Sequence, residues 1–133
     1  MRKLAREICF EMIFEILTRN ECEINEQTLE LLCEQENVLG DDDKQFVVKV
    51  VDSFIQNKDQ ILNSIYEKVT GFAPERIYRV DLALIGLGLT EIKYVGEVDK
   101  GVVINEVVEL AKKFSSEKSP KFVNGVLSAL VEA

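Results

Sequence analysis

The sequence predicts an all-α fold, a single compact domain of about seven helices. Apolar residues recur at helical rather than strand spacing along almost the whole chain. Only two prolines and seven glycines interrupt 133 residues, which favours helices over the turn-rich pattern of a β-sandwich or barrel. A chain of this length, with 47% hydrophobic residues, can bury roughly two-thirds of its unfolded surface. We therefore expect one domain over residues 1–133, with helical halves at about 1–71 and 72–133.

The N-terminal half is expected to hold four helices. The first covers about residues 3–19 and the second about 25–36. Three consecutive acids, Asp41 to Asp43, begin a third helix, where their charge suits the positive end of the helix dipole. A short fourth helix around residues 61–69 is expected to end at Gly71, which fits a C-cap. The apolar stripe of the first helix comprises Leu4, Ile8, Cys9, Met12, Ile13 and Ile16.

The C-terminal half is expected to hold three helices. Pro74 suits the first turn of the fifth helix, which should run to about Tyr94. Asp99 is a good N-cap for the sixth helix. Ser119 followed by Pro120 predicts the N-cap and first position of the seventh. The face that the seventh helix should bury comprises Phe122, Val123, Val126, Leu127 and Leu130.

Two glycines, Gly86 and Gly88, lie inside the fifth predicted helix, in the string LIGLGLTE. No strand precedes them, and neither GxGxxG nor GK[ST] follows, so we do not expect a phosphate-binding loop. An interior glycine costs a helix about 1 kcal/mol relative to alanine. We therefore expect that another helix packs closely against this segment.

The composition argues against an enzyme. Histidine is absent, which removes the usual general base near neutral pH and the commonest zinc ligand. The nucleophile pairs Ser-His and Cys-His are excluded for the same reason. We expect no catalytic residue, no metal site and no cofactor.

The cysteines and the N-terminal segment predict a cytoplasmic protein. Cys9, Cys22 and Cys33 form no CxxC pair and are odd in number, which favours reduced, buried or half-buried thiols over disulfides. Acidic residues follow the first basic ones, so the uncharged core of a signal peptide is absent. The longest uncharged apolar run, residues 82–90, is too short to cross a bilayer, which takes about 20 residues.

The net charge of −8 is concentrated in one part of the sequence. Residues 21–43 include nine acids and neither Lys nor Arg. Charges are screened over about 8 Å at physiological ionic strength, so a basic edge can act independently of an acidic face. The acidic run is interpreted as a solubilising surface or, alternatively, as a surface that attracts a basic protein partner.

The first candidate site lies on the first helix. Arg2 and Arg6 precede Phe10 at intervals of four residues, with Lys3 and Phe14 close to the same line. Cations track phosphates and aromatic rings stack on splayed bases, so this combination suits single-stranded RNA. We expect Arg6 on an exposed basic edge. The alternative is a solvated helix start above core phenylalanines.

The second candidate site brackets the turn between the last two helices. It comprises Lys112, Lys113, Lys118 and Lys121, and Glu117 is the one acid in this segment. The segment leads into a helix N-terminus, where free N–H groups favour an anion such as phosphate. The alternative is ordinary lysine decoration near a helix end.

Several separated strings resemble the NusB family of antitermination factors, in the family's order. They include the basic segment MRKLARE, INEVVELAKKF at residues 104–114 and KFVNGVL at 121–127. ERI at 75–77 and VD at 80–81 extend the resemblance thinly over nearly the whole chain. Leu4 departs from the family pattern, which often has a basic residue there, and Gly86 replaces a frequent arginine.

The resemblance implies a transcription antitermination factor, a non-enzymatic adaptor. It would bind boxA-type single-stranded RNA together with NusE, a small-subunit ribosomal protein, during ribosomal RNA transcription by RNA polymerase. The RNA-binding residues carried over are Arg2, Lys3, Arg6, Phe14, Lys118 and Lys121. The candidates for the NusE side are Glu75 and Asp81. The alternative is a helical protein-interaction module or homodimer without RNA binding, which would bury the basic first helix against a second copy.

Overall fold

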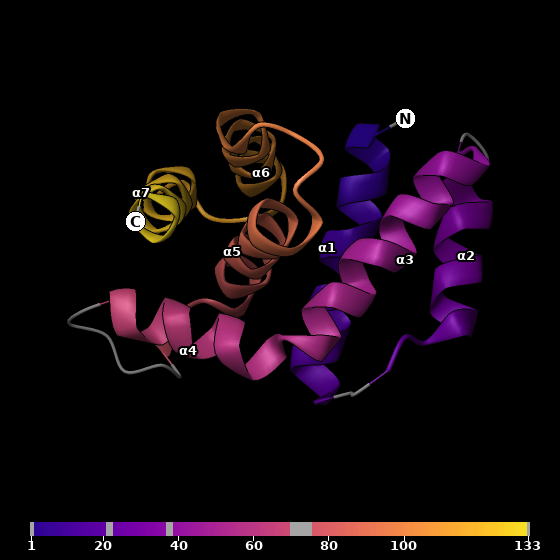
Figure 1. Cartoon of the computed structure of the whole chain (residues 1–133), viewed down its shortest axis with the longest axis horizontal. Coiled ribbons are helices and arrows are strands. Elements are labelled where there is room, and N and C mark those ends of the chain that lie inside the picture. Colours follow the sequence, from indigo (N-terminus) through magenta and orange to yellow (C-terminus); the bar gives the residue numbers. More distant parts are fainter. Residues whose placement is uncertain (1, 21–22, 37–38, 70–75, 133) are drawn as a thin grey trace.

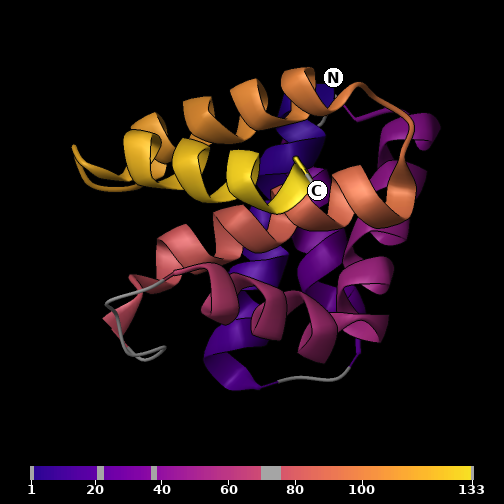
Figure 2. The same cartoon turned by 60° about the vertical axis from the view of Figure 1, so that its left-hand side comes forward.

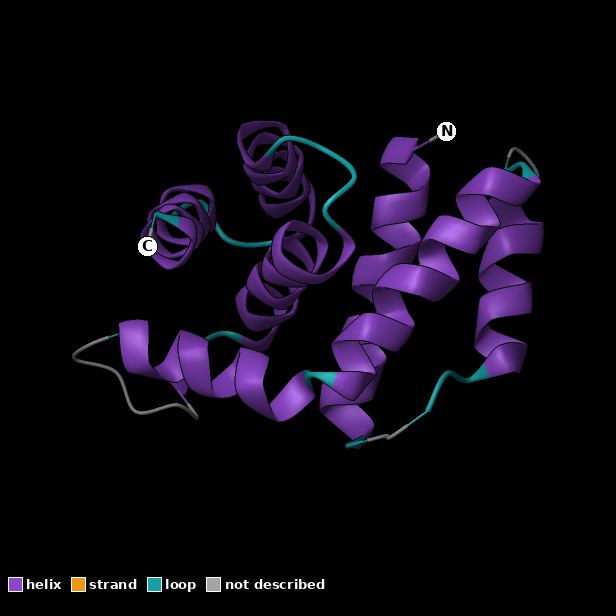
Figure 3. Cartoon of the chain, in the orientation of Figure 1, coloured by secondary structure: helices purple, strands orange, loops and turns teal. Residues whose placement is uncertain are grey.

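The computed structural model describes residues 2–20, 23–36, 39–69 and 76–132, and all regular structure in these ranges is helical (Figure 3). The predicted all-α fold class is confirmed. The α-helices are α1 (Arg2–Arg19), α2 (Glu26–Glu36), α3 (Asp41–Gln56), α4 (Lys58–Lys68), α5 (Arg79–Thr90), α6 (Lys100–Phe114) and α7 (Ser119–Val131). A π-helical turn, η2 (Glu91–Val95), continues α5.

The central element is α5. It packs against α1 and α3 on one side and against α6 and α7 on the other (Figure 1). Every residue from 81 to 90 is buried, as expected for a helix that is apolar on nearly all sides. From the predicted N-terminal half, α4 packs against α5 and α7, so the two halves share one apolar core (Figure 2).

The starts of α3 and α6 agree with the sequence. Asp41 to Asp43 occupy the first turn of α3. Asp99 is the N-cap of α6, and its Oδ2 accepts a hydrogen bond of 3.1 Å from the Gly101 N–H. This side-chain acceptor satisfies one of the backbone donors that a helix start leaves unpaired.

The starts of α5 and α7 differ from the predictions. Lys118, rather than Ser119, is the N-cap of α7, and the Ser119 hydroxyl is bonded elsewhere. The α5 helix begins at Arg79. The predicted first-turn Pro74 and the predicted cap Gly71 lie outside the described residues.

Helical structure beyond α5 ends at a left-handed glycine. The Gly96 N–H donates to the Glu91 carbonyl, five residues earlier, at 2.8 Å, which is the bond of a π-turn. Gly96 has a φ of +67°, where a side chain would be strained. The end of η2 at Val95 lies beside the predicted limit at Tyr94.

The two glycines of α5 permit close helix packing, as predicted. A Cβ atom on Gly88 would lie 2.8 Å from Cδ1 of Leu127 in α7 and 3.4 Å from Cγ2 of Val107 in α6. A Cβ atom on Gly86 would lie 3.1 Å from Cε1 of Phe54 in α3. Each glycine therefore lets a different neighbour approach the central helix.

The predicted core is largely confirmed. Cys9 and Cys33 are free and buried, and burial raises the pKa of the Cys9 thiol, so this thiol stays neutral. Cys22 lies outside the described residues. In α7, the residues that are buried as predicted are Val123, Leu127 and Leu130, whereas Phe122 and Val126 are only half-buried.

We expect Gly88→Ala to destabilise the protein although alanine favours a helix by about 1 kcal/mol. The new methyl group would meet the fully buried Leu127, and overpacking a core typically costs about 1–3 kcal/mol. Urea denaturation should therefore show a net loss of up to about 2 kcal/mol.

Gly125→Ala is the matched control, because Gly125 is an exposed interior residue of α7 with nothing within 4 Å of its would-be Cβ. This variant should gain about 0.5–1 kcal/mol. An equal gain in both variants would contradict the close packing of α5.

Candidate nucleic-acid interface

A buried ion pair occupies the position predicted for an exposed cation. Arg6 is 4% exposed and Glu91 is 1% exposed. The Arg6 Nε and Nη2 groups donate to the two Glu91 carboxylate oxygens, each at 2.7 Å. Burial alone would lower the pKa of Arg6, but the hydrogen bond and charge of Glu91 outweigh it and the pKa is raised. The prediction that Arg6 lies on an exposed edge is therefore wrong.

The register of α1 explains this burial. Arg6 precedes Cys9, Phe10 and Ile13 by three, four and seven residues, and all three are buried. These spacings place Arg6 on the same helix face as the core residues. The helical register of Arg6 therefore indicates that its side chain is buried. It could not identify the partner, because Glu91 lies 85 residues away.

Arg2 is held against α3. Its guanidinium carbon lies 4.2 Å from the centroid of the Phe46 ring, within cation–π range. Its Nε lies 3.5 Å from Oδ1 of Asp43, and 39% of the side chain is exposed. Arg2 therefore joins the start of α1 to α3, and only part of its guanidinium faces solvent.

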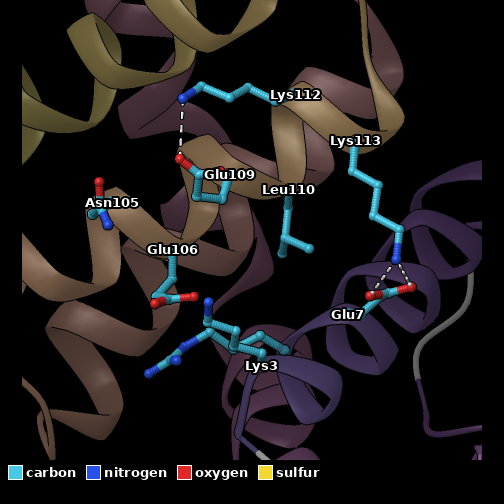
Figure 4. A pocket seen from close by; sticks show the side chains of 9 residues that line it. Lys3, Glu7, Asn105, Glu106, Glu109, Leu110, Lys112 and Lys113 are labelled. Atoms are coloured by element: carbon cyan, nitrogen blue, oxygen red, sulfur yellow. Dashed lines mark hydrogen bonds and ion pairs between the residues drawn. The ribbon is translucent and has the colours of Figure 1, made fainter.

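A groove of about 570 Å³ separates the N-terminal part of α1 from α6 (Figure 4). Its lining comprises Lys3, Arg6, Glu7, Asn105, Glu106, Glu109, Leu110, Lys112 and Lys113. Lys113 reaches across it, and its Nζ lies 3.0 and 3.1 Å from the two oxygens of Glu7. Lys112 instead pairs with Glu109 of its own helix, at 3.0 Å. The second basic segment thus meets α1 through Lys113.

An aromatic row joins α1 to the end of α6. The ring centroid of the buried Phe10 lies 5.2 Å from that of Phe114 and 6.3 Å from that of Phe14. Phe14 is half-buried and packs against the core. The Lys113 Nζ lies 5.1 Å from the Phe114 centroid. The predicted aromatic position, Phe14, therefore borders the core, and the cation of the second segment lies at Phe114, the other end of the row.

The turn between α6 and α7 presents the remaining predicted cations. Lys118 and Lys121 are both exposed, with Lys118 directly before α7 and Lys121 in its first turn. Lys3 of α1 is also exposed and lines the groove. These three lysines are the predicted RNA-binding cations whose side chains lie open to solvent.

Asp81 is buried rather than available to a protein partner. It is 6% exposed, and its carboxylate accepts hydrogen bonds from Ser115 and Ser119 at 2.6 and 3.0 Å. The prediction that Asp81 lies exposed on a contact surface is therefore wrong. The other candidate, Glu75, lies outside the described residues.

The described ranges contain neither a membrane-spanning helix nor a cluster of metal ligands. None of the helices described is both long and apolar enough to cross a membrane. Within the same parts of the chain, no group of three or more His, Cys, Asp or Glu side chains could hold a metal ion.

Comparison with known proteins matches nearly the whole chain to one protein family. Residues 3–132 match the model of the NusB family. The chain is 37% identical to the transcription antitermination protein NusB of Alkaliphilus oremlandii over 131 residues, covering 98% of this chain and 93% of that protein.

Two solved structures share the fold. The crystal structure of antitermination factors NusB and NusE in complex with dsRNA matches with a TM-score of 0.83 and 29% identity, over 97% of this chain and 94% of that one. The T. maritima NusB structure matches with a TM-score of 0.87 and 25% identity, over 99% and 91% of the two chains.

We expect Arg6→Ala to cost about 3–5 kcal/mol of stability, because it leaves the Glu91 carboxylate buried without its counter-charge. Lys113→Ala is the control, since the Lys113 side chain is 60% exposed and its pair with Glu7 should contribute below about 1 kcal/mol. The double variant Arg6→Met/Glu91→Leu should recover most of the loss, because neither charge then remains buried. Urea denaturation checks all three, and equal losses in Arg6→Ala and Lys113→Ala would contradict the buried pair.

Proposed function

The chain belongs to the NusB family, and from this premise we propose that it is a transcription antitermination factor that binds RNA together with NusE. In this role it is an adaptor without catalytic activity, and it acts in the cytoplasm on the RNA that RNA polymerase is transcribing. We further propose that the bound RNA is a single-stranded boxA-type element.

The observation that carries the proposal is the cluster of exposed lysines from the end of α6 to the start of α7. It comprises Lys112, Lys113, Lys118 and Lys121, and the chain that presents it has a net charge of −8. Lys3 lies across the groove on α1. Exposed ammonium groups along the groove and at the adjoining α6–α7 turn suit a phosphate backbone, and the half-buried Phe14 adds an aromatic edge for a base.

The two arginines have a different part in this site. Arg6 is committed to Glu91, so it holds α1 in place instead of contacting phosphate. Arg2 is committed in part to Phe46 and Asp43, and with 39% of its side chain exposed it adds positive charge at the start of α1. RNA affinity therefore depends mainly on lysines, which act as point charges.

We expect Lys121→Ala to weaken RNA binding and to flatten the slope of log K against log salt by about 0.7, because one phosphate contact is lost. Lys68→Ala is the matched control, since Lys68 is an exposed lysine on α4, which lies opposite α6 in Figure 1. Titrations of labelled single-stranded boxA-type RNA and of a duplex of the same sequence, over a salt series, make the measurement. Identical slopes for wild type and Lys121→Ala would remove Lys121 from the interface, and absent binding of either RNA would favour a protein-interaction module.

We expect NusE to raise the RNA affinity of this chain. The cations at the interface are few, and the net charge opposes a polyanion, so contacts supplied by a partner should add a coupling free energy of about 1–3 kcal/mol. Linkage requires RNA to tighten NusE binding by the same factor. RNA titrations at fixed salt with and without NusE test this, and equal affinities would reject the adaptor mechanism.

A further inference from the structure

We propose that Asp81 is a positioning residue for RNA recognition, because its buried carboxylate fixes the serine-rich turn that carries Lys118 and Lys121. The inference rests on the proposed RNA-binding function and adds to it a residue that does not itself touch RNA. Asp81 lies in the first turn of α5, whereas the turn that it holds lies between α6 and α7.

The hydrogen bonds around Asp81 have one consistent direction. The Ser115 hydroxyl donates to Oδ1 at 2.6 Å and the Ser119 hydroxyl donates to Oδ2 at 3.0 Å. Ser119 Oγ in turn accepts from the Ser116 backbone N–H at 3.2 Å, and it lies 2.7 Å from Ser116 Oγ. Since the Ser119 hydroxyl has one proton and gives it to Asp81, Ser119 Oγ is the acceptor for Ser116, and the chain of bonds ends at a carboxylate that only accepts.

Burial makes this network a strong constraint on the turn. Asp81 is 6% exposed and Ser119 is 1% exposed, so water does not readily replace a lost partner. Asp81 also belongs to the buried stretch of α5, which packs against both α6 and α7. The turn is therefore attached to the best-packed helix of the fold.

The network fixes the backbone that carries the two lysines. Lys118 directly precedes Ser119, and Lys121 follows it by two residues, so the anchored serine lies between the two exposed cations. Lys118 is the N-cap of α7 and makes no capping hydrogen bond with its side chain. Tertiary bonds through Ser119 therefore fix this end of α7.

If Asp81 is replaced, the loss of its charge and the loss of its positioning role should change RNA affinity in opposite directions. Replacing Asp81 by Asn removes a negative charge, which by itself strengthens binding to a polyanion. It also removes one acceptor from the network, which releases the turn and weakens binding. Asp52→Asn is the charge-matched control, because Asp52 is exposed on α3 and bonds only Gln56 among the bonds the structure describes for its side chain.

The test is a double-mutant cycle on the full chain, with labelled single-stranded boxA-type RNA over a salt series. The cycle combines Asp81→Asn with Lys118→Ala/Lys121→Ala, and a control cycle combines Asp81→Asn with Lys3→Ala. We expect Asp81→Asn to bind RNA more weakly and Asp52→Asn to bind it as well as the wild type or better. The fold-loss of RNA affinity caused by Lys118→Ala/Lys121→Ala should be about twofold or more smaller in the Asp81→Asn background than in the wild type. The Lys3 cycle should be additive.

Ser119→Ala repeats the cycle from the other side of the network, and it replaces Asp81→Asn if that variant does not fold. Additive effects of the network and lysine substitutions in both cycles would overturn the positioning role while leaving the RNA site in place. A wild-type protein whose RNA affinity is insensitive to the two lysines would overturn the RNA site and the positioning role together.

Discussion

The pairing of Arg6 with Glu91 is the constraint on which the arrangement of the helices depends. Both charges are buried, so each needs the other as a counter-charge. The bidentate hydrogen bonds fix the relative orientation of the two side chains. The pair joins the first helix to the turn that follows the central helix. Arg6 also lies 5.6 Å from the Phe46 centroid, beside Arg2, so the same face of α1 is matched to α3. The basic edge of α1 therefore has a fixed position relative to α6.

Helix periodicity was sufficient to predict the class of fold and most helix limits, because the apolar pattern and caps such as Asp99 are local properties. The roles of Arg6, Asp81 and Ser119 were not predictable in this way. Their partners lie 85, 34 and 38 residues away, and the local pattern, even where it places Arg6 on the buried face of α1, does not identify a partner so distant in the sequence. The exposure of Lys3, Lys118 and Lys121 was predictable, because a cation near a helix end needs no tertiary partner to face solvent.

The distribution of charge reconciles an acidic chain with an RNA-binding surface. The acidic run of residues 21–43 covers α2 and the start of α3, and Figure 1 places α2 and α7 on opposite sides of the molecule. Screening over about 8 Å makes these two faces nearly independent. Within the groove itself, Glu7 and Glu109 partly neutralise Lys113 and Lys112. Lys118 and Lys121, at the α6–α7 turn, are exposed and form no ion pair within the described residues, so their charges are the less neutralised ones.

The wide separation of Arg6 and Glu91 also has a consequence for the order of assembly on the ribosome. At about 5–20 residues per second, the 85 residues between them take roughly 4–17 s to synthesise. Throughout that interval the guanidinium lacks the carboxylate that pairs with it in the folded protein. The pair can therefore lock α1 only after α5 has been made, and α6 and α7 are added to the fold after that.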